Sequence, residues 1–307
     1  MQPQVLLPGG SRVAALLPRR WAETLADAAG GVAARCMAPA RRAVGDNLTQ
    51  ALGACPRTAM RDAFRTYSRY YLSLMRLAHL PAPSAVGPVR VEGEEQLRRT
   101  LERGRGALLL GAHFGNWDVA AIALAARFGA LHAFAEPIRP ARLWRFYAGV
   151  RARHGVRALP SGAHRRLPFA VLHGNGLLGL LADRPFGVRQ ESVPFGHGEI
   201  GVPTGAIRLG LRAGSGIHAT FAVRDADGFV VRIGPDLGRD LAAVEPRARM
   251  REVTARFAAA LHALVQQHPG QWCLMYRVQP SAHEVRPGAE GRGGTPGRNP
   301  GVLREAG

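Results

Sequence analysis

The sequence contains no lysine, because all 41 of its lysine-or-arginine positions are arginine. This absence excludes enzyme classes that depend on a lysine amine: Schiff-base enzymes, P-loop nucleotide enzymes and Ser–Lys hydrolases. Cysteine is scarce as well. Cys36, Cys55 and Cys273 are far apart and form no CxxC pair, which excludes a disulfide scaffold and a cysteine-based zinc site. We therefore expect reduced thiols in a chain whose chemistry uses other side chains.

Long apolar runs are also missing. No stretch of about 18 apolar residues occurs, so no transmembrane helix is expected. The first residues lack the charged start, apolar stretch and small-residue cleavage site of a signal peptide. Hydrophobic residues nevertheless make up 47% of the chain, which is enough to bury a core.

Acidic residues are few, 22 in all, and the formal net charge is +19. The first 80 residues alone hold eleven arginines and four acidic residues. Such a surplus suits acidic partners, here anionic membrane lipids, an acidic headgroup or an acidic carrier protein. A nucleic-acid-binding protein is the alternative that the charge suggests. No binding-fold signature or basic–aromatic interleaving accompanies it, so no nucleic-acid partner is expected.

Residues 1–80 are predicted to be helical and basic. Between residues 57 and 80, apolar side chains recur at three-and-four spacing, which predicts an amphipathic helix. Arg61, Arg65 and Arg69 form a row beside its apolar face. The row fits either a solvated flank or an interfacial helix facing anionic lipid headgroups. We therefore divide off residues 1–80 as a basic, membrane-facing segment.

Residues 81–278 are predicted to form an α/β core, in which a mostly parallel central sheet is flanked by helices. Its predicted strands are 107–111, 131–135, 156–159, 177–182, 217–224 and 229–233. The predicted helices are 116–127, 140–154, 163–173, 203–213 and 248–267. The DADG stretch at 225–228 predicts a hairpin between the last two strands. Residues 279–307 lack periodicity and are predicted to be a disordered tail.

One motif joins a strand end to a helix start: residues 111–118 read GAHFGNWD. Ligands of open α/β sheets bind at the carboxyl ends of strands, which is where His113 lies. Asn116 is placed to cap the next helix, and Asp118 lies in its first turn. A carboxylate reaching back from Asp118 would fix the imidazole tautomer, and the other ring nitrogen could then take a proton from a hydroxyl. Alternatively, Asp118 only favours the helix dipole and His113 is structural.

The HFGNWD stretch, an H-x4-D box after an apolar strand, resembles the bacterial lysophospholipid and lipid A late acyltransferase superfamily. Within it the chain looks most like the phosphatidylinositol mannoside acyltransferases. The similarity spans roughly residues 15–278 and continues in AEPIRP at 135–140, GVRAR at 149–153, Asp183-Arg184, VPFG at 193–196 and VPTG at 202–205.

The resemblance implies roles for particular residues. His113 would be the general base and Asp118 its partner. Backbone N–H groups around Gly115 and Asn116, at the start of the helix, would stabilise the oxyanion. The residues that would line the cleft or bind substrate are Glu136, Arg151, Asp183, Arg184 and Arg139; the last two are placed to bind phosphate of the donor.

The implied reaction moves an acyl group from acyl-CoA or acyl-carrier protein to a lipid hydroxyl, with no cofactor and no metal. Glu136 stands where the lipid A enzymes carry arginine. This favours a sugar-bearing, mannoside-like glycolipid acceptor over lipid A, which remains the alternative. The implied location is the cytoplasmic face of the cell membrane, as a peripheral protein. Three other classes are a non-enzymatic basic nucleic-acid- or membrane-binding protein, a metal-assisted hydrolase and an inactive homologue.

Overall fold

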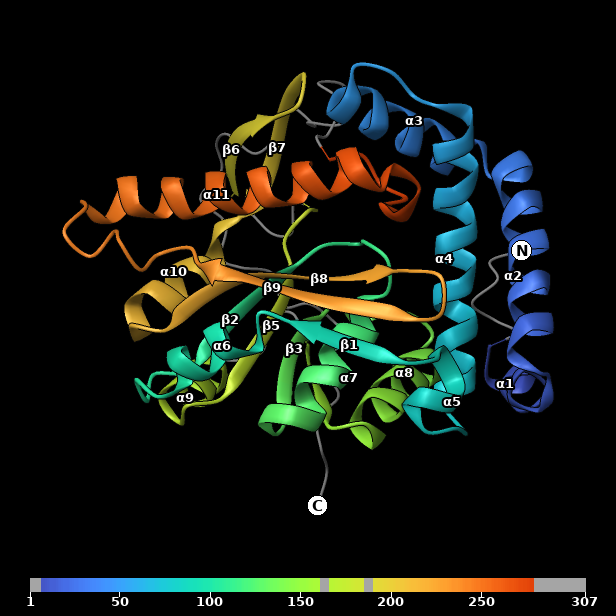
Figure 1. Ribbon diagram of the computed structural model, residues 1–307, viewed down its shortest axis with the longest axis horizontal. Coiled ribbons are helices and arrows are strands. Elements are labelled where there is room, and N and C mark those ends of the chain that lie inside the picture. The colour runs from blue at the N-terminus through green and yellow to red at the C-terminus, as the bar shows by residue number, and fades with distance from the viewer. Residues whose placement is uncertain (1–6, 161–165, 185–189, 279–307) are drawn as a thin grey trace, which may run out of the picture.

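A seven-stranded sheet organises the protein in the computed structural model, which describes residues 7–160, 166–184 and 190–278 (Figure 1). The strand order is β1-β9-β8-β2-β5-β3-β4. The strands are β1 (Val89–Glu92), β2 (Ala107–Gly111), β3 (Leu131–Ala135), β4 (Val156–Pro160), β5 (Leu177–Leu181), β8 (Gly216–Arg224) and β9 (Phe229–Asp236). Neighbours in this sheet pair in parallel except for the antiparallel hairpin β8–β9. The predicted α/β class and the mostly parallel sheet are confirmed.

Helices cover both faces of the sheet. Alternate residues of β2 point into two separate apolar clusters, Ala107 and Leu109 into one and Leu108 and Leu110 into the other. The first cluster lies under α5 (Ala82–Val86), α6 (Glu94–Leu101), α7 (Trp117–Phe128) and α8 (Ala141–Arg153). The second lies under α9 (Arg166–His173), α10 (Thr204–Ala213), α11 (Pro246–Gln267) and a separate hairpin of β6 (Gln190–Phe195) and β7 (Gly198–Pro203). Strand β2 is buried from both sides, which explains why it is continuously apolar.

The N-terminal helices form an outer layer at one end of the sheet (Figure 1). They are α1 (Leu7–Leu16), α2 (Arg19–Cys36), α3 (Ala38–Leu52) and α4 (Arg57–Leu77). The apolar face of α4 joins the two clusters, because Phe64 belongs to one while Leu74 and Leu77 belong to the other. A short turn, η2 (Pro269–Gln271), also packs on α4. The described part of the N-terminal segment, residues 7–80, is thus attached to the core through α4.

In the arginine row of α4, Arg61 is exposed, whereas Arg65 and Arg69 are only partly exposed. Helices α1 and α2 pack against α4 from outside. Arg69 is ion-paired with Asp27 of α2, and Arg65 donates to Asp62 at 3.1 Å. Because α1 and α2 pack on α4 and both Arg65 and Arg69 form ion pairs, the structure favours the solvated flank over the interfacial helix as the interpretation of this row.

Sequence patterns missed the strands that are short or lie outside the α/β alternation. These are β1, which has four residues, and the hairpin β6–β7. The helix predicted from residue 163 begins at Arg166 among the described residues, and the predicted tail 279–307 lies outside them. No helix of the described ranges is long and apolar enough to cross a membrane.

Candidate active site

Two neighbouring parallel strands bring the central histidine to its partner. Gly111 at the end of β2 is in register with Leu181 at the end of β5, and the Ala182 N–H donates to the Gly111 carbonyl at 2.8 Å. His113 and Asp183 each lie two residues beyond these strand ends. The sheet therefore places them side by side at its carboxyl edge, the edge where α/β proteins bind ligands.

Asp183 holds His113 in one tautomer. The Nδ1 atom of His113 lies 2.9 Å from one carboxylate oxygen of Asp183. The other oxygen accepts the His113 backbone N–H at 2.9 Å and the Trp272 indole N–H at 3.0 Å. Burial by itself would raise the pKa of the Asp183 carboxyl, but the charge and hydrogen bonds of His113 and Trp272 lower it below its usual value. A carboxylate here fixes the proton on Nδ1 and leaves Nε2 as the basic nitrogen.

Asp118 does not contact His113 in this way, and its predicted role as the histidine's partner is corrected. Its carboxylate accepts two hydrogen bonds from Arg151, at 2.6 and 3.0 Å, and one from the Tyr70 hydroxyl at 2.8 Å. Asp118 lies in the first turn of α7, which directs its side chain toward α4 and α8. Burial would lower the pKa of the Arg151 guanidinium, but Asp118 and Tyr70 raise it above its usual value. The pair is an internal tie between three helices.

This tie supports the histidine indirectly. The Tyr70 ring stacks on Trp117, with centroids 3.8 Å apart. Trp117 in turn meets the His113 ring edge-on at 5.0 Å. Holding Tyr70 therefore holds the indole that flanks the imidazole.

His113 opens into a cavity of about 310 Å³. At its mouth, Glu136 and Arg184 form an ion pair of 3.0 Å, and the Arg184 guanidinium lies 4.4 Å from the centre of the Tyr276 ring. Arg151 and Asp118 also line the cavity. Arg139 is exposed on the segment between β3 and α8 and does not line it, so the structure does not bring this predicted residue to the site.

The interior of the cavity is lined mainly by apolar side chains. It follows β3 from Ala135 at the carboxyl edge back to Leu131, the first residue of that strand. Five residues of strand extend about 16 Å. Opposite β3, Ala121 and Leu124 of α7 form the wall. Gly179 of β5 also lines the cavity, and a Cβ there would make only ordinary contacts with Leu131 and Ala133. The site therefore joins His113 at a polar mouth to an apolar cavity along β3, which we call the channel.

The sequence profile of the bacterial lipid A biosynthesis acyltransferase family matches residues 5–278. The chain belongs to this family. The acyltransferase resembles curated phosphatidylinositol mannoside acyltransferases. One from Mycolicibacterium smegmatis is 27% identical over 274 residues, which cover 87% of this chain and 88% of the relative. One from Mycobacterium tuberculosis is 28% identical over 240 residues, which cover 75% and 74%. The resemblance drawn from the HFGNWD motif is thereby confirmed.

The turn after His113 in this acyltransferase does not offer the predicted oxyanion donors. Gly115 adopts φ +56°, and a Cβ there would lie 1.9 Å from the Ala222 carbonyl oxygen, so glycine is required. Its N–H donates to the Gln271 carbonyl at 2.8 Å. The Asn116 side chain accepts the Val119 N–H at 3.2 Å and caps α7 as predicted. Both residues line a second cavity and not the one at His113, so their proposed oxyanion role is corrected.

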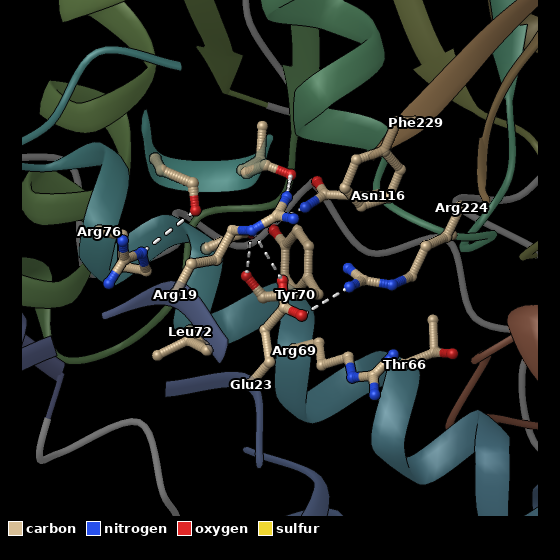
Figure 2. Close-up of a pocket in the computed structure, with 14 residues that line it drawn as sticks. Arg19, Glu23, Thr66, Arg69, Tyr70, Leu72, Arg76, Asn116, Arg224 and Phe229 are labelled. Atoms are coloured by element: carbon tan, nitrogen blue, oxygen red, sulfur yellow. Dashed lines mark hydrogen bonds and ion pairs between the residues drawn. The ribbon is translucent and has the colours of Figure 1, made fainter. Parts of the chain in front are cut away.

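That second cavity lies on the other side of Tyr70 and holds four arginines around Glu23 (Figure 2). Its volume is about 20 Å³, room for one water molecule. Arg224 pairs with Glu23 at 2.8 Å, and Arg19 donates to the Asp227 carbonyl at 2.8 Å. Arg76 is buried and donates to the carbonyls of Ala14, Leu17, Ser84 and Ala85. These contacts use N–H donors of the arginines and link α1 and α2 to the rest of the fold.

Sequence reasoning missed four residues of the site: Tyr70, Tyr147, Trp272 and Cys273. Burial raises the pKa of the Cys273 thiol above its usual value, and Asp183 adds to the effect, so this thiol is no nucleophile. The Tyr147 hydroxyl is buried and has no hydrogen-bond partner, although its side chain lines the cavity. No His, Cys, Asp or Glu cluster suited to a metal occurs among the described residues. Only a knowledge of strand order and helix packing could have placed these four.

Proposed function

We propose that this acyltransferase moves a fatty acyl group from a thioester donor, acyl-CoA or acyl-carrier protein, to a hydroxyl of a membrane glycolipid of the phosphatidylinositol mannoside kind. The observation that carries the proposal is the His113–Asp183 pair at the head of an apolar channel. In this proposal His113 is the general base, and the reaction needs no cofactor.

The proposed chemistry uses the free Nε2 of His113. Nε2 removes the proton of the acceptor hydroxyl as its oxygen attacks the thioester carbonyl. Asp183 stabilises the resulting imidazolium. When the tetrahedral intermediate collapses, the C–S bond breaks and the leaving thiolate takes the proton back from Nε2. The products are an ester and a free thiol, and the histidine returns to its starting state.

The channel supports a fatty acyl substrate. Away from Asp118 and Arg151, its wall along β3 and along Ala120, Ala121 and Leu124 of α7 has no charged side chain. Burying a hydrocarbon chain against this wall is favourable in proportion to the area covered. The charged groups gather at the mouth, where Glu136 and Arg184 lie. An acyl chain held inside would place its thioester carbonyl beside His113.

The acceptor is proposed from Glu136 and from the relatives. A half-exposed carboxylate at the mouth accepts hydrogen bonds from sugar hydroxyls, and the relatives are named as phosphatidylinositol mannoside acyltransferases. Because the acceptor is a membrane lipid, we place the enzyme as a peripheral protein at the cytoplasmic face. Arg184 at the mouth suits a donor phosphate.

A competition assay tests the function. Purified enzyme is offered one acyl-CoA together with a phosphatidylinositol mannoside and a lipid A precursor, and the acylated lipids are identified by mass spectrometry. We expect acylation of the mannoside. Acylation of the lipid A precursor alone would overturn the choice of acceptor.

The base is tested by His113→Ala. Losing a general base typically costs about 10²–10⁴-fold in turnover, and we expect a loss of this size in a folded protein. Wild-type turnover in a folded His113→Ala enzyme would refute the mechanism.

A further inference from the structure

The outward side of α1 and α2 carries large apolar side chains in contact with solvent. Val13 and Leu16 of α1 are 61% and 85% exposed, and Trp21, Leu25 and Val32 of α2 are 70%, 59% and 59% exposed. On α2 these positions, with Ala28, recur at helical spacing and share one face. The two helices follow each other in the chain and both pack on α4, so these five exposed side chains lie in one region of the surface. Exposed apolar surface of this kind marks interaction sites.

Both helices turn this side away from the core. Each packs on α4 (Figure 1), and the side chains of Ser11 and Ala14 on α1 are buried. On α2 the buried residues are Ala22, Ala26 and Gly30. A Cβ at Gly30 would come within 2.8 Å of the α4 backbone, so the two helices lie in close backbone contact. The apolar stripe opposite is therefore not needed to hold α2 in place.

The charges on the two helices are sorted by side. Arg12, Arg20 and Arg35 are exposed beside the apolar stripe. The acidic residues of α2 face inward, where Glu23 pairs with Arg224 and Asp27 pairs with Arg69. The outward side is thus apolar and positive, with no acidic side chain in its described part.

A groove continues the positive surface. Arg12 lines it from α1, Arg145 and Arg153 line it from α8, and no acidic residue does. It adjoins α8, whose other side lines the catalytic cavity through Tyr147 and Arg151.

We propose that the outward side of α1 and α2, defined by Val13, Leu16, Trp21, Leu25 and Val32 with Arg12, Arg20 and Arg35, is the surface by which the enzyme docks on an anionic lipid bilayer. The apolar side chains enter the boundary between headgroups and acyl chains, and the arginines bind lipid phosphates, as in interfacial amphipathic helices. The inference deepens the proposed function, since a lipid acceptor must be reached from a bilayer, and it replaces α4 by α1 and α2 as the membrane-facing element.

Vesicle co-sedimentation of the full chain tests the surface. The vesicles contain phosphatidylcholine with or without phosphatidylglycerol, at low and high salt. Trp21→Ser/Leu25→Ser/Val32→Ser should lower the partition coefficient at least about tenfold, because each of these side chains loses its burial in lipid. Leu167→Ser/Val244→Ser, which removes exposed apolar side chains from α9 and from the segment before α11, should bind like the wild type.

A second pair of variants separates local from overall charge. Arg12→Gln/Arg20→Gln/Arg35→Gln should lose about tenfold or more of the binding to phosphatidylglycerol vesicles. Arg90→Gln/Arg99→Gln/Arg251→Gln removes the same charge from exposed positions elsewhere and should lose far less. Tryptophan fluorescence adds a direct readout: the emission should shift to the blue on vesicle binding, and Trp21→Phe should abolish most of the shift while it retains binding.

Equal losses in the test and control variants would overturn the proposal. So would a wild-type dimer that the triple serine variant dissociates without any effect on vesicle binding, since the patch would then join two copies of the chain. Acyl transfer to a detergent-dispersed acceptor is measured on the same variants. Retained transfer with lost vesicle binding supports the surface, whereas absent transfer in the wild type speaks against the proposed function and leaves the docking result standing.

Discussion

Replacing Asp183 by asparagine should invert the tautomer of His113. One carboxylate oxygen of Asp183 accepts two N–H donors, the His113 backbone and the Trp272 indole. An asparagine must therefore keep its carbonyl oxygen at that position, because its NH2 group there would face both donors. The amide nitrogen then takes the position of the other carboxylate oxygen, which lies 2.9 Å from Nδ1 of His113, and donates a hydrogen bond to Nδ1. Nδ1 becomes the acceptor and Nε2 carries the proton, so Nε2 can no longer take one.

The expected loss is roughly 10²–10⁴-fold in kcat, the range found when a base is held in its unreactive tautomer. The volume of the residue hardly changes, so the cavity and the KM for the acyl donor should stay close to the wild type. Turnover is measured with saturating acyl-CoA and detergent-dispersed acceptor, and circular dichroism reports on folding.

A double-mutant test makes the result specific. If Asp183 acts only through His113, Asp183→Asn should have little further effect on an enzyme that already carries His113→Ala. A folded Asp183→Asn enzyme with wild-type kcat would refute the tautomer reasoning. So would a loss that simply multiplies with that of His113→Ala.

Three further predictions concern the surroundings of the base. Asp118→Asn leaves the buried Arg151 without its counter-charge and should lower the free energy of unfolding, measured by urea titration, by about 3–5 kcal/mol. Steady-state kinetics should show a smaller fall in kcat than for Asp183→Asn, and unchanged stability would contradict a structural role for the Asp118–Arg151 ion pair. Gly179→Val places a side chain in the channel, where a Cβ meets only ordinary contacts, and should shift the preferred acyl-CoA to shorter chains. Turnover is measured with acyl-CoA donors of increasing chain length, and an unaltered preference would show that the acyl chain binds elsewhere. The pKa of Asp183 is lower in the folded protein than in the unfolded chain, so its contribution to stability is present above the unfolded pKa of about 3.9 and is lost as pH falls through the folded pKa. Below pH about 3.9, the urea midpoint of Asp183→Asn should therefore fall less steeply with decreasing pH than that of the wild type.

Much of the fold follows from sequence periodicity. The apolar runs that became β2 and β5 and the hairpin signal at 225–228 are local features, and the structure has strands and a turn at these places. The argument that His113 ends a strand at the carboxyl edge also needs only local information. Strand β1 was missed because four residues with half-exposed side chains give no apolar run.

The partner of His113 could not be found in the same way. Asp118 is near in sequence, and local reasoning therefore favoured it. Asp183 is near His113 in space only because β5 pairs with β2 in parallel. The order of strands in a sheet cannot be predicted from any single stretch of sequence. The oxyanion assignment failed for a similar reason, since the Gly115 N–H is taken by Gln271, which is distant in sequence.

The order of strands also determines when the protein can fold during its synthesis. Strand β2 lies between β5 and β8, and β1 pairs only with β9, so the sheet is incomplete until residue 236 has left the ribosome. The core-facing side of α4, which emerges much earlier, is completed by Trp272 and α11 near the end of the described chain. Such long-range pairing slows folding and leaves apolar surface open to aggregation meanwhile. The site around His113 is therefore completed late, when Trp272 reaches Asp183, and the core-facing side of α4 stays open to solvent until then.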